Sequence, residues 1–167
     1  MLYFLKEDLE ALKKRRDTLY ESYLEASKAM GEACEQSSET WHDNAPYDEA
    51  KRAAEGLNTQ VSGFNEMIAR ASLVECPASP PKNVCIGCEV HYQQQSSGEE
   101  RSVLIGSFWV PMDSSEGSPR RISYQSPVGK SFIGHKIGDT VTAVLPKGAE
   151  KYLITAINVP TSEAAQQ

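Results

Sequence analysis

The chain has 167 residues, of which 40% are hydrophobic and 24% charged, a composition typical of globular proteins with one or two domains. Its formal net charge of -6 argues against a free-standing duplex DNA binder, which needs clustered Lys and Arg. No apolar run approaches the roughly 18 residues of a membrane span. The first residues lack the basic start and long apolar stretch of a signal peptide, which predicts a cytoplasmic protein with four reduced cysteines.

Two long segments carry apolar residues at alternating spacings of three and four, with Arg16 the one unfavourable member. This spacing predicts two helices that bury a narrow seam against each other. About thirty residues at ~1.5 Å each give a rod of roughly 45 Å. The seam positions are Leu5, Leu9, Leu12, Arg16, Leu19, Tyr23, Ala26, Met30 and Ala33 in the first segment, and Tyr47, Ala50, Ala54, Leu57, Val61, Phe64, Ile68 and Ala71 in the second.

A polar stretch separates the two predicted helices. The first helix is expected to run from about Leu5 to about Gln36, and the turn to occupy about residues 37–44. Asp43 or Asn44 can cap the second helix, because either side chain accepts hydrogen bonds from the first turn. Pro46 suits that first turn, where its missing N–H costs nothing. Residues 1–76 are therefore predicted to form an antiparallel coiled-coil hairpin.

The proline-rich segment 77–81 ends the second helix and predicts a stiff linker. Beyond it the hydrophobic period changes to two, which indicates strands. We expect strands at 84–92, 102–110, 139–145 and 152–157, with turns at 96–98 and 146–148 and a short helix at 126–134. The predicted fold class is α+β: the hairpin, then a small antiparallel sheet domain with a short helix over 82–160, then a polar tail at 161–167 that we expect to be disordered.

Two short motifs have chemical interpretations that their surroundings do not support. Cys85 and Cys88 have the spacing of half a zinc site or of a redox pair, but no second pair supplies the remaining zinc ligands. On the predicted strand the two side chains also point to opposite faces, which favours a structural role. The sequence Gly129-Lys130-Ser131 lacks the upstream glycine of a phosphate loop, because Tyr124 occupies that position.

The predicted tip combines carboxylates with a large aromatic side chain. It contains Glu39, Thr40, Trp41, His42 and Asp43. One interpretation is an ordinary hairpin turn in which Asp and Asn cap and Trp41 packs onto the seam. A second is a contact surface at the end of a rigid rod.

The basic cluster on the first helix has two interpretations as well. It consists of Lys13, Lys14, Arg15 and Arg16. It can be a solvated helix face balanced by nearby Glu and Asp, or a patch for RNA or for an acidic protein surface.

The order of these parts, together with the string from Ser126 to Val141, resembles the Gre family of bacterial transcription elongation and transcript cleavage factors. In that family the C-terminal domain carries Ser-Pro, then an apolar-apolar-Gly, then Gly-Asp-x-Val, and the string here matches nearly every fixed position. The segment from Val84 to Val90 resembles the family's first C-terminal strand. The resemblance covers Leu5 to Val159.

The resemblance implies an accessory factor without an active site of its own. The hairpin is expected to enter the secondary channel of RNA polymerase and approach the nascent RNA 3′ end, while an FKBP-like C-terminal domain docks at the channel entrance. No cofactor of its own is implied. Two tip acids of the family help hold the second Mg²⁺ of the polymerase, because carboxylates stabilise a hard dication that activates water.

The tip departs from the family motif at its chemistry. Asn44, Ala45 and Tyr47 match, but Thr40 replaces the first acid, Asp43 replaces a Glu, and Pro46 replaces the third acid. We expect Asp43 to act on the polymerase Mg²⁺ with Glu39 or Thr40, and the cluster from Lys13 to Arg16 to face RNA. The residues expected to contact polymerase are Trp41, His42, Asn44, Ser126, Pro127, Gly134, Gly138 and Asp139.

Three functions remain open at this point. The first is a factor that stimulates transcript cleavage by the polymerase, and the second is a plug of the channel that inhibits without cleavage. The third is a helical-hairpin adaptor unrelated to polymerase.

Overall fold

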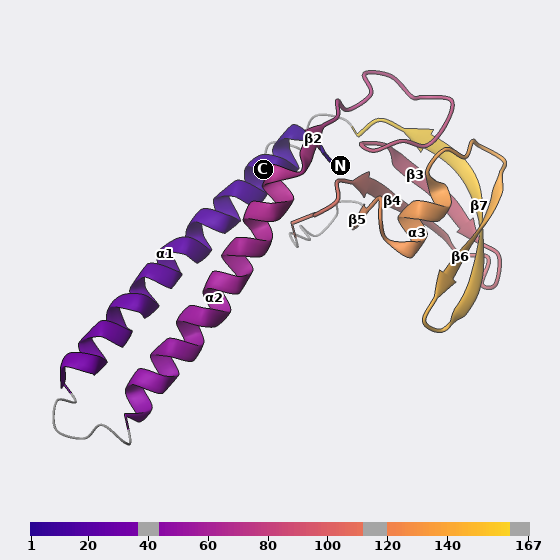
Figure 1. The fold of residues 1–167 in the computed structure, drawn as a ribbon. Coiled ribbons are helices and arrows are strands. Elements are labelled where there is room, and N and C mark those ends of the chain that lie inside the picture. The colour runs from indigo at the N-terminus through magenta and orange to yellow at the C-terminus, as the bar shows by residue number, and fades with distance from the viewer. Residues whose placement is uncertain (37–43, 112–119, 161–167) are drawn as a thin grey trace. The chain divides into compact units, whose positions relative to one another are not determined.

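The computed structural model describes residues 1–36, 44–111 and 120–160. Two long helices, α1 (Lys6–Gln36) and α2 (Ala45–Ala69), lie side by side in opposite directions (Figure 1). Their facing side chains are buried where the spacing predicts a seam, at Leu12, Leu19, Ala54 and Val61. The predicted hairpin is confirmed. No helix in these described ranges is long and apolar enough to cross a membrane.

Arg16 occupies its seam position without losing its polar partners. Its Nη1 donates to Asn65 Oδ1 of α2 at 2.8 Å, and its Nε donates to Asp17 Oδ1 at 2.6 Å. The side chain keeps 31% of its exposure. Because the guanidinium reaches the edge of the seam, its long aliphatic part can cover apolar surface while its charge stays hydrated.

The second helix ends earlier than the sequence predicts. It stops at Ala69, and Ala71–Leu73 forms strand β2, which pairs in parallel with strand β1 (Leu2–Phe4). Leu2 and Phe4 are buried, with 8% and 0% exposure. The expectation of a helix continuing to the prolines was therefore wrong, because the pairing with β1 draws this segment out of the helix.

A five-stranded sheet has the strand order β5-β4-β3-β7-β6. Its neighbours pair antiparallel except β4 and β5, which are parallel, so the predicted antiparallel sheet needs this one correction. The strands are β3 (Glu89–Gln94), β4 (Glu100–Gly106), β5 (Arg120–Ser123), β6 (Thr140–Leu145) and β7 (Gly148–Asn158).

The core of this sheet is closed by the short helix α3 (Pro127–Phe132), which packs beside β6. Phe132 is fully buried, and its ring centroid lies 5.2 Å from that of Tyr92 and 5.8 Å from that of Tyr152. Aromatic rings at these separations interact favourably when tilted, as they are here. The predicted short helix is confirmed, and it contributes the central side chain of the core.

The chain divides into two compact units whose limits differ from the predicted domains. One unit is Glu10–Arg70, and the other combines Met1–Leu9 with Ala71–Gln167. These limits differ from the predicted boundary at 77–81, because the first nine residues bury Leu2, Phe4, Leu5 and Asp8 in the sheet-containing unit. The α+β class is confirmed. The predicted disordered tail at 161–167 lies outside the described residues.

Two predicted strand segments were also wrong. Residues 84–88 form a turn before β3, because Gly87 adopts a φ of +91°, which is incompatible with a strand. Residues 108–110 lie beyond the end of β4 at Gly106.

Candidate functional site

The base of the hairpin tip is held by Asn44. Its side-chain oxygen accepts from the backbone N–H of Tyr47 at 3.1 Å, and its side-chain nitrogen donates to the carbonyl of Ala33 at 2.9 Å. Ala33 is among the last four residues of α1, whose carbonyls have no partner within the helix. One amide therefore joins the last turn of α1 to the first turn of α2, which an aspartate with no N–H donor could not do.

The clamp also fixes where α2 begins. Pro46 lies in the first turn of α2, as predicted, and Asn44 rather than Asp43 is the cap. Of the residues predicted to act at the tip, Glu39, Thr40, Trp41, His42 and Asp43 lie outside the described residues.

The string that carries the family resemblance forms the α3 turn. Ser126 Oγ caps α3 by accepting from Gly129 N at 3.0 Å, and it donates to Ser123 O at 2.7 Å. A Cβ on Gly129 would lie 2.2 Å from Ser123 O, so only glycine fits. Pro127 takes the first helical position, where proline is favoured. The Gly-Lys-Ser sequence is thus explained by helix packing.

The end of the string forms a second turn. Gly134 and Gly138 adopt φ values of +83° and +90°. Asp139 Oδ2 accepts from Lys136 N at 3.0 Å and lies 3.4 Å from His135 Nδ1. The hydrogen bond from the Lys136 backbone, followed by that from His135, lowers the pKa of Asp139. These predicted contact residues have structural roles, and contact with a partner stays a prediction.

The basic cluster is divided by its surroundings. Lys13, Lys14 and Arg15 are exposed on α1, whereas Arg16 is engaged by Asn65 and Asp17. Three of the four predicted residues are therefore available to an anionic partner.

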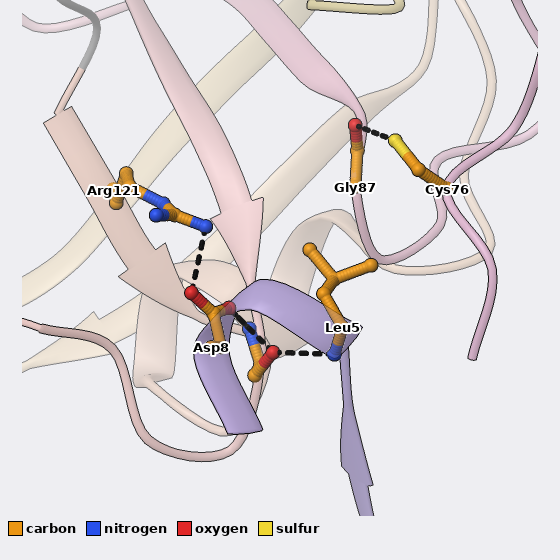
Figure 2. Close-up of polar contacts among 6 residues, drawn as sticks. Leu5, Asp8, Cys76, Gly87 and Arg121 are labelled. Atoms are coloured by element: carbon orange, nitrogen blue, oxygen red, sulfur yellow. Dashed lines mark hydrogen bonds and ion pairs between the residues drawn. The ribbon is translucent and has the colours of Figure 1, made fainter. Parts of the chain in front are cut away.

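A buried polar group ties the start of α1 to the sheet, and sequence reasoning missed it. Figure 2 shows Asp8, which is 1% exposed, with its side chain directed to Arg121 of β5. Asp8 Oδ2 accepts from Ser107 Oγ at 2.5 Å, and Asp8 Oδ1 lies 2.8 Å from Arg121 Nη2. Ser107 Oγ in turn accepts from Leu5 N at 2.8 Å.

This arrangement pairs a charge that would otherwise be costly to bury, while Asp8 Oδ1 and Arg121 Nε are left without a hydrogen bond among the described residues. No periodic pattern could have indicated it, because an acid in the first turn of a helix is already favoured by the helix dipole. Its consequence is that residues 1–8 are part of the sheet-containing unit.

The cysteine pair differs from its prediction. Cys85 and Cys88 lie on the turn of residues 84–88, and their Sγ atoms are 3.0 Å apart, so they do not point to opposite faces of a strand. Cys76 Sγ donates to Gly87 O of the same turn at 3.4 Å (Figure 2). Three of the four cysteines therefore gather at one place.

Comparison with known proteins agrees with the family resemblance of the string from Ser126 to Val141. A family model described as the C-terminal part of transcription elongation factor GreA/GreB matches residues 79–159. Transcription elongation factor GreA of Christiangramia forsetii is 30% identical over 154 residues, covering 89% of this chain and 92% of that protein. Transcription inhibitor protein Gfh1 of Thermus aquaticus is 27% identical, covering 92% of this chain and 94% of that protein.

Among solved structures, GreA factor homolog 1 (Gfh1) of Thermus thermophilus aligns with a TM-score of 0.42 at 25% identity, covering 93% of this chain and 97% of that one. The match to GreA extends over nearly the full length of both chains. The chain therefore belongs to the GreA/GreB family of transcription elongation factors.

Proposed function

We propose that this protein binds RNA polymerase in the cytoplasm and inserts its hairpin into the secondary channel, where the tip modulates backtracking, pausing and transcript cleavage. Family membership supports polymerase as the partner and argues against an unrelated adaptor. The observation that carries the proposal is the Asn44 clamp, which holds the last turn of α1 to the first turn of α2, the two turns that flank the tip residues in the sequence.

The tip acts on the polymerase's own Mg²⁺ in this proposal. Asp43, with Glu39 or Thr40, supplies oxygen ligands to the second Mg²⁺, which activates the water that attacks the RNA backbone. The protein is then an accessory factor, and the polymerase performs the cleavage. A threonine hydroxyl in place of an acid is a weaker ligand for a hard dication, so we expect cleavage to require more Mg²⁺ than with two carboxylates.

A cleavage assay on stalled, backtracked elongation complexes tests the mechanism. Native protein should shorten the RNA, and Asp43→Asn should abolish most of this activity while it still competes with native protein for polymerase. Thr40→Asp should increase cleavage and lower the Mg²⁺ concentration required. Asp48→Asn, an exposed acid on α2, is the matched control. Cleavage that survives Asp43→Asn would exclude Asp43 and point to Glu39.

A second candidate is a channel plug that inhibits nucleotide addition without cleavage. The similarity to the transcription inhibitor Gfh1 and the loss of one tip acid at Thr40 favour it. In that case native protein shortens no RNA at any Mg²⁺ concentration. Asp43→Asn then leaves inhibition unchanged, because a plug depends on shape rather than on a metal ligand.

The exposed part of the basic cluster is proposed to face the nascent RNA. Replacing Lys13, Lys14 and Arg15 with Ala should reduce crosslinking to the RNA 3′ end. The crosslinking should also become less sensitive to salt, because a protein with fewer positive charges releases fewer counterions from the RNA when it binds. Lys51→Ala, an exposed position on α2, is the control. Unchanged crosslinking would show that the cluster is only a solvated helix face.

A further inference from the structure

The turn before β3 holds two thiols in contact. The Sγ atoms of Cys85 and Cys88 are 3.0 Å apart, and the turn is closed by a hydrogen bond from Cys88 N to Cys85 O at 3.3 Å. A disulfide bond is about 2.05 Å long. The two sulfurs therefore need to approach by only about 1 Å, a change that side-chain rotation can supply.

The two thiols have different surroundings. Cys88 is fully buried in the core, and burial, followed by the hydrogen bond with Cys85, raises its pKa to about 12. Cys85 is half-buried and lines a cavity of about 460 Å³ together with apolar side chains such as Val84, Ile86 and Ile133. A small oxidant can therefore reach Cys85, while Cys88 stays protonated behind it.

A metal site is a weaker explanation of this cluster. Within residues 1–36, 44–111 and 120–160, no group of three or more Cys, His, Asp or Glu side chains is arranged to hold a metal ion. Cys76 contacts this turn from a segment outside it, and its Sγ is directed to Gly87 O. The geometry thus presents a pair of thiols with a third nearby.

We propose that Cys85 and Cys88 form a reversible disulfide when the protein meets hydrogen peroxide. Cys85 sulfur attacks one peroxide oxygen, the O–O bond breaks, and the products are a sulfenic acid on Cys85 and one water. Cys88 sulfur then attacks Cys85 sulfur, the S–S bond forms, the S–O bond breaks, and the hydroxyl leaves as a second water with the Cys88 proton. Two thiols lose two electrons in total, and one peroxide becomes two waters.

The roles of the two residues follow from their exposure. The first step needs contact with the oxidant, which Cys85 has through the cavity and Cys88 lacks. The second step needs a thiol already in contact with the sulfenic acid, which Cys88 provides. The inference is independent of the tip chemistry, because the thiols and the cavity lining all belong to the sheet-containing unit.

Mass spectrometry of the full-length protein tests the proposal, because trypsin separates the cysteines. Cys85 and Cys88 lie together on peptide 83–101, whereas Cys76 lies on 71–82 and Cys34 on 29–51. After peroxide, denaturation and iodoacetamide, peptide 83–101 should have lost two hydrogens and carry no alkyl group. Dithiothreitol should restore both alkylations. Cys34, exposed in the other unit, reports non-specific oxidation.

Two variants test which cysteine reacts with peroxide and which one completes the disulfide. Cys88→Ser should leave a Cys85 sulfenic acid that dimedone traps, and Cys76→Ser should form the disulfide as the native chain does. Two alkyl groups on native peptide 83–101 after peroxide would overturn the proposal, as would a disulfide joining this peptide to 71–82. Should Cys88→Ser fail to fold, the experiment on the native chain still decides.

Discussion

The hairpin and the sheet-containing unit hold their structures in different ways. Among the described residues between Glu10 and Arg70, the buried side chains form one line along two helices: Leu12, Leu19, Ala54 and Val61. The other unit has a three-dimensional core in which residues from α3 and four strands contact one another. A line of contacts can be lost locally, whereas removing one member of a shared core affects all the others. The hairpin should therefore fray in parts, and the sheet should unfold as a whole.

The largest effect is expected at the centre of the sheet's core. Phe132→Ala removes a fully buried ring that packs on Tyr92 and Tyr152. We expect the free energy of unfolding in urea to fall by about 3–5 kcal/mol. Hydrogen exchange should rise throughout the sheet. Ile133→Ala, at the exposed neighbouring position, is the control, and equal loss of protection in α1 and α2 would show that the two units unfold together.

The next effect tests whether the first residues belong to the sheet-containing unit. Asp8→Ala leaves Arg121 and Ser107 without their buried acceptor. We expect the free energy of unfolding to fall by about 3 kcal/mol. This is at the low end for a broken buried ion pair, because the Arg121 side chain is 26% exposed. Amide exchange should increase in β4 and β5. Glu7→Ala, one residue away and exposed, should change little, and exchange that rises only in α1 would contradict the assignment.

A smaller and local effect is expected at the base of the tip. Asn44→Ala removes the cap of α2 and the link to Ala33, so helix stability should fall by about 1 kcal/mol. Asn44→Asp sharpens the test, because it keeps the acceptor for Tyr47 N but loses the donor to Ala33 O. Exchange at the Tyr47 amide should rise with Ala and stay low with Asp. Asn58→Ala, exposed on α2, is the matched control.

The smallest effect is expected at the Asp139 turn when the pH is lowered. The pKa of Asp139 is lowered mainly by the hydrogen bond from Lys136 N, so its ionised form is the one that the folded turn prefers. The contribution is present above the ordinary pKa of an aspartate and is lost as the pH falls through the lowered value. Exchange at the Lys136 amide should therefore rise only in acid, after correction for intrinsic rates. In Asp139→Asn the pH dependence of exchange at the Lys136 amide should disappear. If it persists, a group other than Asp139 causes it.

The parts of the fold that repeat a local pattern could be predicted from sequence. The 3-4 spacing gives both helices, and Ser126 with Pro127 marks the start of α3. Strand β2 could not be predicted, because three residues carry no periodic signal and its partner β1 is about seventy positions away. Alternating apolar residues at 84, 86, 88 and 90 predicted a strand through the cysteines, but the positive φ of Gly87 interrupts it.

The candidate site was predictable only through resemblance. The tip motif named Asp43, Asn44 and Thr40, but no rule of spacing separates a tip that binds Mg²⁺ from a capped turn. The second role of Asn44 depends on Ala33, which lies eleven positions away on another helix. The Asp8 network joins positions about one hundred residues apart, so it is a property of the folded chain rather than of any segment.

The pairing of β1 with β2 and of Asp8 with Arg121 also affects how the chain folds during synthesis. Residues 2–8 leave the ribosome before the hairpin does, yet β2, the partner of β1, and Arg121, the partner of Asp8, follow only after the whole hairpin has emerged. The hairpin relies on contacts within its own sixty residues and can form early. Strand β1 stays unpaired until β2 has followed the hairpin, and Asp8 waits longer, until Arg121 of β5 has been made. Slow translation would therefore endanger this short strand more than the long helices.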